Sequence, residues 1–220
     1  MKNFKALVQL DFKLLAPYWK WWLMFFGFSL LMSIANQDGY TFIISLPMFA
    51  GTMMAFPFES TDKSNLNVLY TSLPTNRKTQ VSARYGFILI SLVITIIISI
   101  ITALIVNSIF DQNHDFNVYI AFIALSFGIF LTMTGFQTPF FYKIGYTKGK
   151  IFMWIPIIVV VVLMNVPALL DIINIDFDFN IFEMAFRNTT ITSIVSIITG
   201  IVVAIVSYLV SYKIYLKRDF

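Results

Sequence analysis

The only histidine of the chain offers a first possibility for metal chemistry. His114 stands close to Asp111 and Asp115, and an imidazole with two carboxylates can bind a metal ion. The usual zinc sites add a further histidine or a cysteine, and the chain has neither. We therefore interpret His114 as a solvated loop residue and predict that the chain binds no metal.

Motifs for enzymatic chemistry are missing as well. The sequence has no G-x-S-x-G, no H-E-x-x-H and no G-x-x-x-x-G-K-[ST]. Gly149 and Lys150 lack the upstream glycine and the following hydroxyl of a phosphate-binding loop. Deep in the apolar segments the polar residues are mostly Ser and Thr, with Gln137 and Asn165, and none is ionisable. Intramembrane enzymes and ion-coupled carriers need such groups, so we expect no catalytic residue, no ion coupling and no cofactor on this chain.

The composition places these residues in a membrane protein. Hydrophobic residues make up 59% of the chain, charged residues 12%, and the mean hydropathy is +0.83. A helix needs about 20 apolar residues to cross the roughly 30 Å hydrocarbon core, and the stretches lack the alternation of barrel strands. We predict one all-α domain over residues 1–220 with six spans, at about 18–35, 40–58, 87–110, 118–141, 151–170 and 189–212.

The basic residues predict the orientation of the spans. Six spans put the N-terminus, the second and fourth loops and the C-terminus on one side, and fourteen of the fifteen Lys and Arg residues fall there. Arg187 is the exception, and the opposite loops are acidic. By the positive-inside rule both termini lie on the cytoplasmic side of the cell membrane. The basic pI near 9.2 then indicates contact with anionic lipids and no nucleic acid.

Residues 1–16 form an amphipathic segment ahead of the first span. At helical spacing the apolar residues cover one face and Lys2, Lys5 and Lys13 the other, as in a helix that lies at the membrane interface. Asp11 falls within the apolar face, so we expect it to meet a partner. Ser33 to Ala35 has the form of a signal-peptide cleavage site, but the long patterned segment before the apolar run argues against one.

The loop between the second and third spans, residues 59–85, is too long and too patterned for a simple connection. We predict that Ser60 or Thr61 caps a helix with Asp62 in its first turn, and that Pro74 ends that helix. Asn76 can cap a second helix that continues into the third span. The loop is therefore a helical hairpin. Residues 171–187, apolar with four acids, form a structured external segment before the last span.

This order of elements resembles the permease subunit of an ABC-2-type (type V) exporter. Residues 59–85, with Leu73-Pro74, Arg77-Lys78, Val81 and Arg84-Tyr85, look like the small bacterial permeases for bacteriocin immunity and peptide export. The richness in aromatics and isoleucine is closest to permeases of the phenol-soluble-modulin exporter. The resemblance implies two cytoplasmic ATPase subunits, which bind ATP and magnesium, and a second permease chain, identical or related.

The resemblance also assigns roles to residues. The hairpin is the coupling helix, about residues 62–72, and its contacts with the ATPase would be made by Asp62, Lys63, Leu66, Leu69, Tyr70, Leu73, Arg77 and Lys78. The N-terminal segment resembles the connecting helix, so Asp11 could meet the ATPase. The substrate path between spans two and five would be lined by Phe49, Met53, Met54, Phe56, Val161, Met164 and Asn165. Flexible Met and flat Phe side chains suit an amphipathic peptide.

Two other functions remain open at this point. An immunity permease would use the same machinery to expel a foreign antimicrobial peptide, and the sequence does not separate it from an exporter. A membrane scaffold or an intramembrane enzyme lies outside transport. The absence of deep ionisable residues disfavours the enzyme, and the patterned hairpin disfavours the scaffold.

Overall fold

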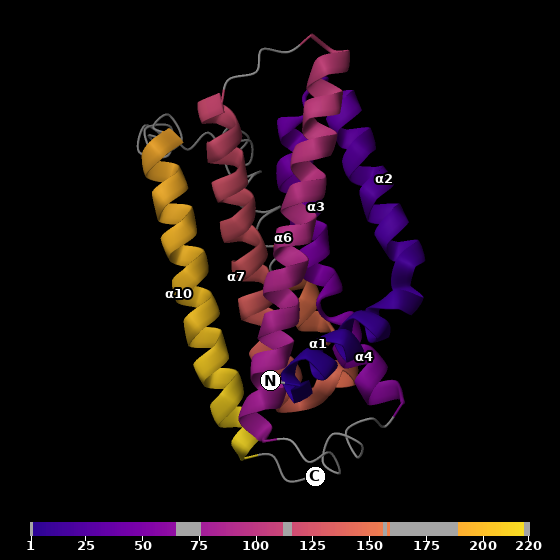
Figure 1. The fold of residues 1–220 in the computed structure, drawn as a ribbon, viewed down its shortest axis with the longest axis vertical. Coiled ribbons are helices and arrows are strands. Elements are labelled where there is room, and N and C mark those ends of the chain that lie inside the picture. Colours follow the sequence, from indigo (N-terminus) through magenta and orange to yellow (C-terminus); the bar gives the residue numbers. More distant parts are fainter. Residues whose placement is uncertain (1, 65–75, 112–115, 156–157, 159–188, 218–220) are drawn as a thin grey trace, which may run out of the picture.

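The computed structural model describes residues 2–64, 76–111, 116–155, 158 and 189–217. Within these ranges every regular element is helical, which confirms the predicted all-α class for that part of the chain. The elements are α1 (Lys2–Leu15), a 3-10 turn (Ala16–Tyr18), α2 (Trp19–Ala35), α3 (Tyr40–Met53), α4 (Phe56–Lys63), α6 (Arg77–Ile109), α7 (Phe116–Gly149) and α10 (Thr189–Leu216) (Figure 1).

Four helical segments of the described ranges are long and apolar enough to cross a membrane: Tyr40–Lys63, Arg77–Ile109, Phe116–Gly149 and Thr190–Leu216. They correspond to the predicted spans two, three, four and six. The predicted first span is α2, which has 17 residues. The predicted fifth span, 151–170, and the external segment, 171–187, lie largely or wholly outside the described residues. The chain is thus a multi-pass membrane protein, and the count of six stays a prediction.

The predicted N-terminal helix is present, and its apolar face is covered by protein. α1 packs across α6 and α4 at one end of the bundle (Figure 1). Leu7 and Val8 are buried, and Phe12 meets the Phe87 ring edge-on at 4.8 Å between centroids. The helix therefore has an internal partner for the face that the sequence analysis assigned to the membrane interface.

The second span is interrupted, which the sequence analysis did not predict. α3 ends at Met53 and α4 begins at Phe56. Pro57 lies in the first turn of α4, where its missing N–H costs nothing. Gln137 donates a hydrogen bond of 2.6 Å to the Gly51 carbonyl just before the interruption. This contact gives the buried Gln137 amide a partner and fixes α7 against the end of α3.

The start predicted for the hairpin helix is wrong. Thr61 and Asp62 lie in the last turn of α4, not at the beginning of a new helix. The Thr61 hydroxyl donates to the Pro57 carbonyl, 2.6 Å away, inside that helix. Pro57 sets the first turn of α4, so Ser60 and Thr61 fall inside that helix, and residues 65–72 of the predicted hairpin helix lie outside the described residues. Asn76, in contrast, occupies the N-cap position of α6 with extended backbone angles, as predicted, although its side chain makes no capping hydrogen bond.

α7 is also interrupted, at Gly145. This residue has φ 74° and ψ 168°, a conformation that is essentially restricted to glycine. The helix changes direction there and continues for a short inner segment to Gly149. The predicted span 118–141 thus lies within the long part of α7, before the break.

α7 and α10 lie side by side and touch through small residues (Figure 1). A Cβ atom built on Gly128 would lie 2.7 Å from the Ser196 carbonyl oxygen, and one on Gly135 would lie 2.7 Å from Val203. The sequence analysis pointed to no close approach here. In a membrane the hydrophobic effect does not drive helices together, so their association depends on close packing. Glycine on these faces allows the two helices to approach closely.

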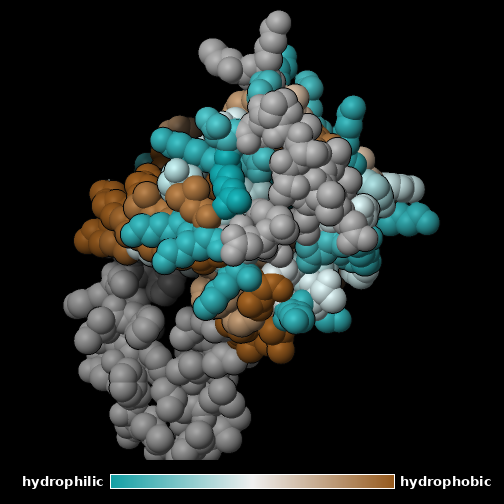
Figure 2. Space-filling model, turned by 90° about the horizontal axis from the view of Figure 1, so that it is seen from below, coloured by the Kyte–Doolittle hydropathy of each residue, from teal (hydrophilic) through white to brown (hydrophobic). Residues whose placement is uncertain are grey.

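The charges are separated along the long axis of the bundle. One end, here named the basic end, is formed by α1, α4, the first turns of α6, residues 143–150 and the last turns of α10 (Figure 1). Viewed from that end, hydrophilic side chains gather across its face (Figure 2). The other end, here named the far end, carries Asp38 and Asp111. This separation agrees with the charge pattern from which the orientation was predicted.

Candidate functional site at the basic end of the bundle

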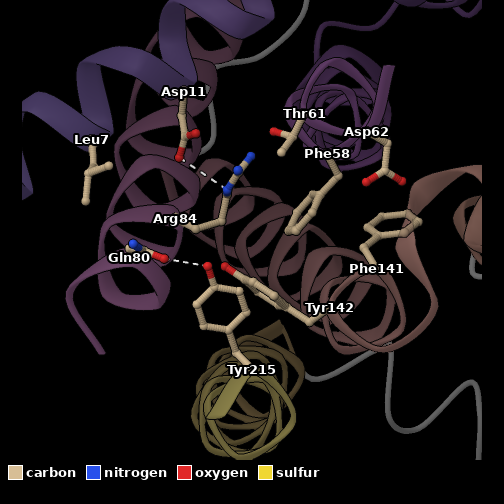
Figure 3. A pocket seen from close by; sticks show the side chains of 10 residues that line it. All are labelled: Leu7, Asp11, Phe58, Thr61, Asp62, Gln80, Arg84, Phe141, Tyr142 and Tyr215. Carbon is tan, nitrogen blue, oxygen red and sulfur yellow. Dashed lines mark hydrogen bonds and ion pairs between the residues drawn. The ribbon is translucent and has the colours of Figure 1, made fainter. Parts of the chain in front are cut away.

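A small cavity of about 40 Å³ opens between five helices at the basic end. It is lined by side chains from α1, α4, α6, α7 and α10, which point toward one another in Figure 3. A space of this size has room for a few water molecules, because one water needs roughly 10–15 Å³. The lining residues are Leu7, Asp11, Phe58, Thr61, Asp62, Gln80, Arg84, Phe141, Tyr142 and Tyr215.

An ion pair between Asp11 and Arg84 crosses one side of this cavity. The Arg84 Nε lies 3.3 Å from Asp11 Oδ2, and the side chains are 7% and 4% exposed. The Arg84 guanidinium also lies over the Phe58 ring, 4.4 Å from its centre, where a cation is attracted by the ring face. Three elements, α1, α6 and α4, thus meet at one buried cation.

Burial is the dominant electrostatic influence on Asp11. Loss of water raises the pKa of its carboxyl from 3.8 to about 6, and the attraction of Arg84 only partly offsets that rise. Asp11 Oδ1 has no hydrogen-bond partner within the described part of the chain. A buried carboxylate with one oxygen that lacks a hydrogen bond lowers the stability of the fold. The packing of α1 at this site therefore depends on whether Asp11 is protonated.

α10 joins the site through hydroxyl groups. The Tyr215 hydroxyl donates a hydrogen bond to Gln80 on α6, and Tyr85 shares hydrogen bonds with Ser207 and Ser211, at 2.6 and 3.0 Å. The Arg77 guanidinium donates to the Leu216 carbonyl at 2.6 Å, at the last turn of α10. A cation at the C-terminus of a helix also suits the helix dipole. The first turns of α6 and the last turns of α10 are therefore fastened together.

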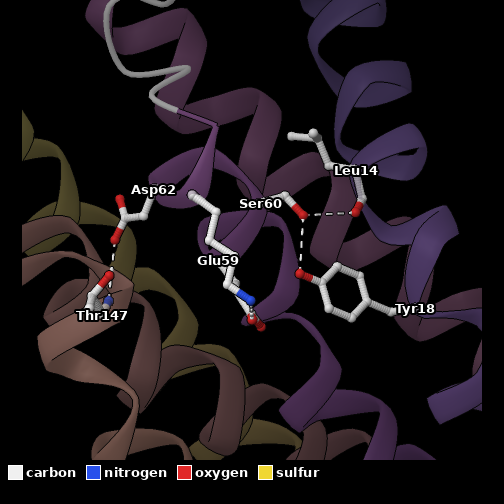
Figure 4. Close-up of polar contacts among 7 residues, drawn as sticks. Leu14, Tyr18, Glu59, Ser60, Asp62 and Thr147 are labelled. Atoms are coloured by element: carbon white, nitrogen blue, oxygen red, sulfur yellow. Dashed lines mark hydrogen bonds and ion pairs between the residues drawn. The ribbon is translucent and has the colours of Figure 1, made fainter.

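α4 is held on the opposite side by the junction of α1 and α2. The Ser60 hydroxyl contacts the Leu14 carbonyl at 3.2 Å and the Tyr18 hydroxyl at 3.4 Å (Figure 4). The Tyr18 ring stacks on Phe56, with 4.3 Å between centroids. Ser60, which was predicted as a helix cap, instead ties the middle of α4 to the N-terminal elements.

Asp62 ties α4 to the interruption in α7. Its Oδ2 accepts a hydrogen bond from the backbone N–H of Tyr146, at 2.5 Å. It also accepts one from the backbone N–H of Thr147, at 3.3 Å (Figure 4). Both donors follow Gly145 directly, so the carboxylate caps the short inner segment of α7. Phe58 adds ring contacts with Phe141 and Tyr142, at 5.3 and 5.2 Å between centroids.

A sequence model of the ABC-2 family transporter proteins matches residues 6–216, nearly the whole chain. The chain belongs to the ABC-2 transporter family. No curated protein and no solved structure matches it. The family consists of membrane components of ABC transporters, which work with ABC ATPase subunits and are not themselves catalytic.

The structure brings only part of the predicted coupling set of this ABC-2 permease together. Asp62, Lys63, Arg77 and Lys78 lie at the basic end, and Lys63 pairs with Glu59 in an exposed contact of 2.5 Å. Leu66, Leu69, Tyr70 and Leu73 lie outside the described residues, as does His114. The role of the set in contacting the ATPase stays a prediction.

The predicted substrate-path residues on the second span are mostly inside the permease. Met53 and Met54 are 1% exposed, Phe56 is 8% exposed, and all three belong to one buried cluster with Leu7 of α1. Phe49 is half-buried and stacks on Phe25, with 4.9 Å between centroids. Val161, Met164 and Asn165 lie outside the described residues. A path along α3 and α4 would therefore need these side chains to be uncovered.

Sequence reasoning missed most of the cavity. It expected a partner for Asp11 and marked Arg84 as part of the hairpin motif, but it did not connect the two. Gln80, Tyr142 and Tyr215 were not singled out at all. The signal that could have helped is that Asp11 is the one charge on an apolar helix face and Arg84 precedes the third span, so both are ionisable groups that need a partner near the membrane.

Proposed function

We propose that this permease is the membrane subunit of an ATP-driven exporter that moves amphipathic peptides, similar to phenol-soluble modulins, out of a bacterial cell. Two cytoplasmic ATPase subunits bind the hairpin between α4 and α6, and two permease chains form the path. The basic end and both termini of the chain face the cytoplasm. ATP and magnesium are bound by the ATPase partners.

The observation that carries this proposal is the convergence of five helices at the base of the hairpin. α4 enters the hairpin and α6 leaves it, and both are fastened to α1, α7 and α10 by the contacts around Arg84 and Asp62. A force that reaches the end of α4 or the start of α6 is therefore passed on to α1, α7 and α10 through these contacts. A converter of ATPase movement into span movement needs this arrangement.

The preference for peptides rests on the path residues. Met53, Met54 and Phe56 are apolar and closed off in this conformation, and they lie on either side of the interruption between α3 and α4. A movement of α4 at that interruption would uncover a flexible apolar surface with no charge. Such a surface suits the apolar face of an amphipathic helix.

Affinity purification from the native host tests the coupling role. The unmodified permease is expected to bring down a P-loop ATPase, and Tyr70→Asp is expected to lose it while still inserting in the membrane. Thr71→Asp is the matched control, because it adds the same charge one position away, off the apolar stripe that helical spacing predicts for Leu66, Leu69, Tyr70 and Leu73. Retention of the ATPase by Tyr70→Asp would refute the assignment of the coupling helix. Recovery of no ATPase with the unmodified chain would refute the exporter.

A second experiment tests the cargo. The purified permease–ATPase complex in liposomes is titrated with a synthetic amphipathic helical peptide and, as a control, with a scrambled peptide of equal composition that lacks an apolar face. The proposal expects stimulation of ATP hydrolysis by the first peptide alone. Equal responses to both peptides would contradict the proposed substrate class.

A further inference from the structure

We propose that Asp62 is a positioning residue that fastens the inner segment of α7 to α4, so that these two segments move as one body. The inference deepens the proposed function, because it concerns how movement spreads from the hairpin. It gives Asp62 a role inside the permease in place of a contact with the ATPase.

The first support is the geometry at the interruption of α7. A helix N-terminus exposes N–H groups that lack helical partners, and the Gly145 break creates such an end inside α7. The Asp62 carboxylate accepts from the first two of these groups, after Gly145. The negative charge also suits the positive end of the helix dipole. The contact joins residues that are 84 and 85 positions apart in the chain.

The second support is the fit between Asp62 and Gly145. A Cβ atom on Gly145 would lie 3.0 Å from Asp62 Oδ2, which is tighter than ordinary packing. The backbone of Gly145 is also in a region that side chains disfavour. Two features of the sequence, an acid at the end of α4 and a glycine in α7, are therefore explained by one contact.

The third support is the apolar contact next to it. Phe58 lies one turn before Asp62 on α4 and packs on Phe141 and Tyr142 of α7. The rings hold the two helices together on one side, and the carboxylate fixes their relative position along the helix axis. Rings alone allow sliding, whereas hydrogen bonds to two successive N–H groups do not.

The far end of the chain provides a matched control for Asp62. Asp38 is also a half-buried aspartate that caps a helix, and it accepts from the Tyr40 N–H at 2.5 Å and from the Thr41 hydroxyl at 2.7 Å. Its partners lie two and three residues along the chain, so it fastens no second helix. Asp38→Ala therefore removes a cap of the same kind without removing a connection between spans.

Distance measurement between spin labels tests the proposal. The chain contains no cysteine, so Ser64→Cys beside Asp62 and Lys148→Cys on the inner segment of α7 can be labelled alone. Double electron–electron resonance on the permease–ATPase complex gives the distribution of the label distance, without nucleotide and trapped with ATP and vanadate. With Asp62 present we expect one narrow distribution that is the same in both states.

Removing the carboxylate should separate the two segments. Asp62→Ala is expected to broaden the distribution and to shift it when ATP and vanadate are added. Asp62→Asn, which keeps one acceptor oxygen, should give an intermediate width, and Asp38→Ala should match the unmodified permease. Gly145→Ala, which crowds the carboxylate from the other side, should broaden the distribution as Asp62→Ala does.

Two results would overturn the proposal. A nucleotide-dependent shift with Asp62 present would show that the segments move independently. A narrow, unshifted distribution in Asp62→Ala would show that the carboxylate does not hold them. Failure of the proposed function looks different: no ATPase is recovered with the unmodified chain, yet the width measured without nucleotide still reports whether Asp62 fastens α7.

Discussion

The two ends of the bundle each contain a buried polar side chain that joins several helices, and the two differ in charge. At the basic end Arg84 joins α1, α4 and α6. At the far end Asn107 on α6 accepts from the Gly39 N–H at 2.6 Å and donates to the Tyr119 hydroxyl at 2.6 Å, and so joins α6 to the start of α3 and to α7.

Because of this difference in charge, the Asn107 contacts at the far end do not depend on ionisation, whereas the Asp11–Arg84 contact at the basic end does. Asn107 is fully buried and neutral, and the Tyr40 ring packs against Tyr119 beside it, at 4.9 Å between centroids. Nothing in this contact depends on ionisation. At the basic end the ion pair is buried but incompletely hydrogen-bonded, and Asp11 titrates close to physiological pH. If the ATPase moves the permease from the basic end, the contacts at that end must be able to change, while those at the far end stay the same.

The largest effect is expected from Arg84→Ala. It leaves Asp11 buried without its counter-ion, and breaking a buried pair in this way costs about 3–5 kcal/mol. Thermal unfolding of the purified permease in detergent should show the loss. The double variant Asp11→Leu/Arg84→Met removes both charges and keeps apolar volume, so it should recover most of the stability. Equal stability of Arg84→Ala and the unmodified chain would mean that the pair does not hold α1.

Asn107→Ala should come second. It leaves the buried Gly39 N–H without the Asn107 acceptor, at a cost of about 1–3 kcal/mol. The loss should be the same at pH 5 and pH 7.5, because neither partner titrates in that range. Unfolding scans at both values check this. A loss that depended on pH would contradict the contrast drawn between the two ends.

The effect of pH on α1 should be smaller and confined to the basic end. The pKa of Asp11 is about 6 in the docked helix and 3.8 in water, so the docked form binds the proton more tightly. Docking is therefore strongest at low pH and weakens as the pH rises through about 6. Arg84 from α6 faces Asp11 across the cavity, as do Tyr142 from α7 and Asp62 from α4.

Thiol labelling can measure that change. In the chain without cysteine, Leu7→Cys reports the buried face of α1 and Gln9→Cys its exposed face. The labelling rate of the first relative to the second should be lower at pH 5 than at pH 7.5. Asp11→Asn, which is neutral throughout, should remove the dependence. The same pH dependence in Asp11→Asn would assign it to another group.

The smallest effect is expected from Lys63→Ala. Its pair with Glu59 is exposed, and exposed pairs contribute little because water and salt screen them. No measurable change in the unfolding temperature should result. Any loss of function in this variant would then report a contact with a partner and not a loss of folding, which separates it from the buried contacts above.

Local sequence patterns predicted many of the helices, but they did not predict which residues of distant helices contact one another. The helical spacing of apolar residues predicted α1, and Asn76 predicted the start of α6, because both signals depend on residues that are close in sequence. Proline alone does not mark the interruption before Pro57, because Pro47 and Pro139 lie inside α3 and α7. The pairs Asp11–Arg84 and Asp62–Tyr146 could not be predicted, because they depend on which helices pack together, and a single sequence does not specify that.

The contact of α7 with α10 restricts how this permease can change over evolution. A side chain at Gly128 or Gly135 has no space, since Ser196 and Val203 already occupy it, so substitutions there must be matched by changes on the opposite helix. The outward face of α10, with Ile194, Ile198 and Ile201 exposed, has no such neighbour within the described chain. Random mutagenesis should therefore find many tolerated apolar substitutions on the outward side of α10 and very few on the side that faces α7. The positions that tolerate no substitution would then identify the contact between α7 and α10.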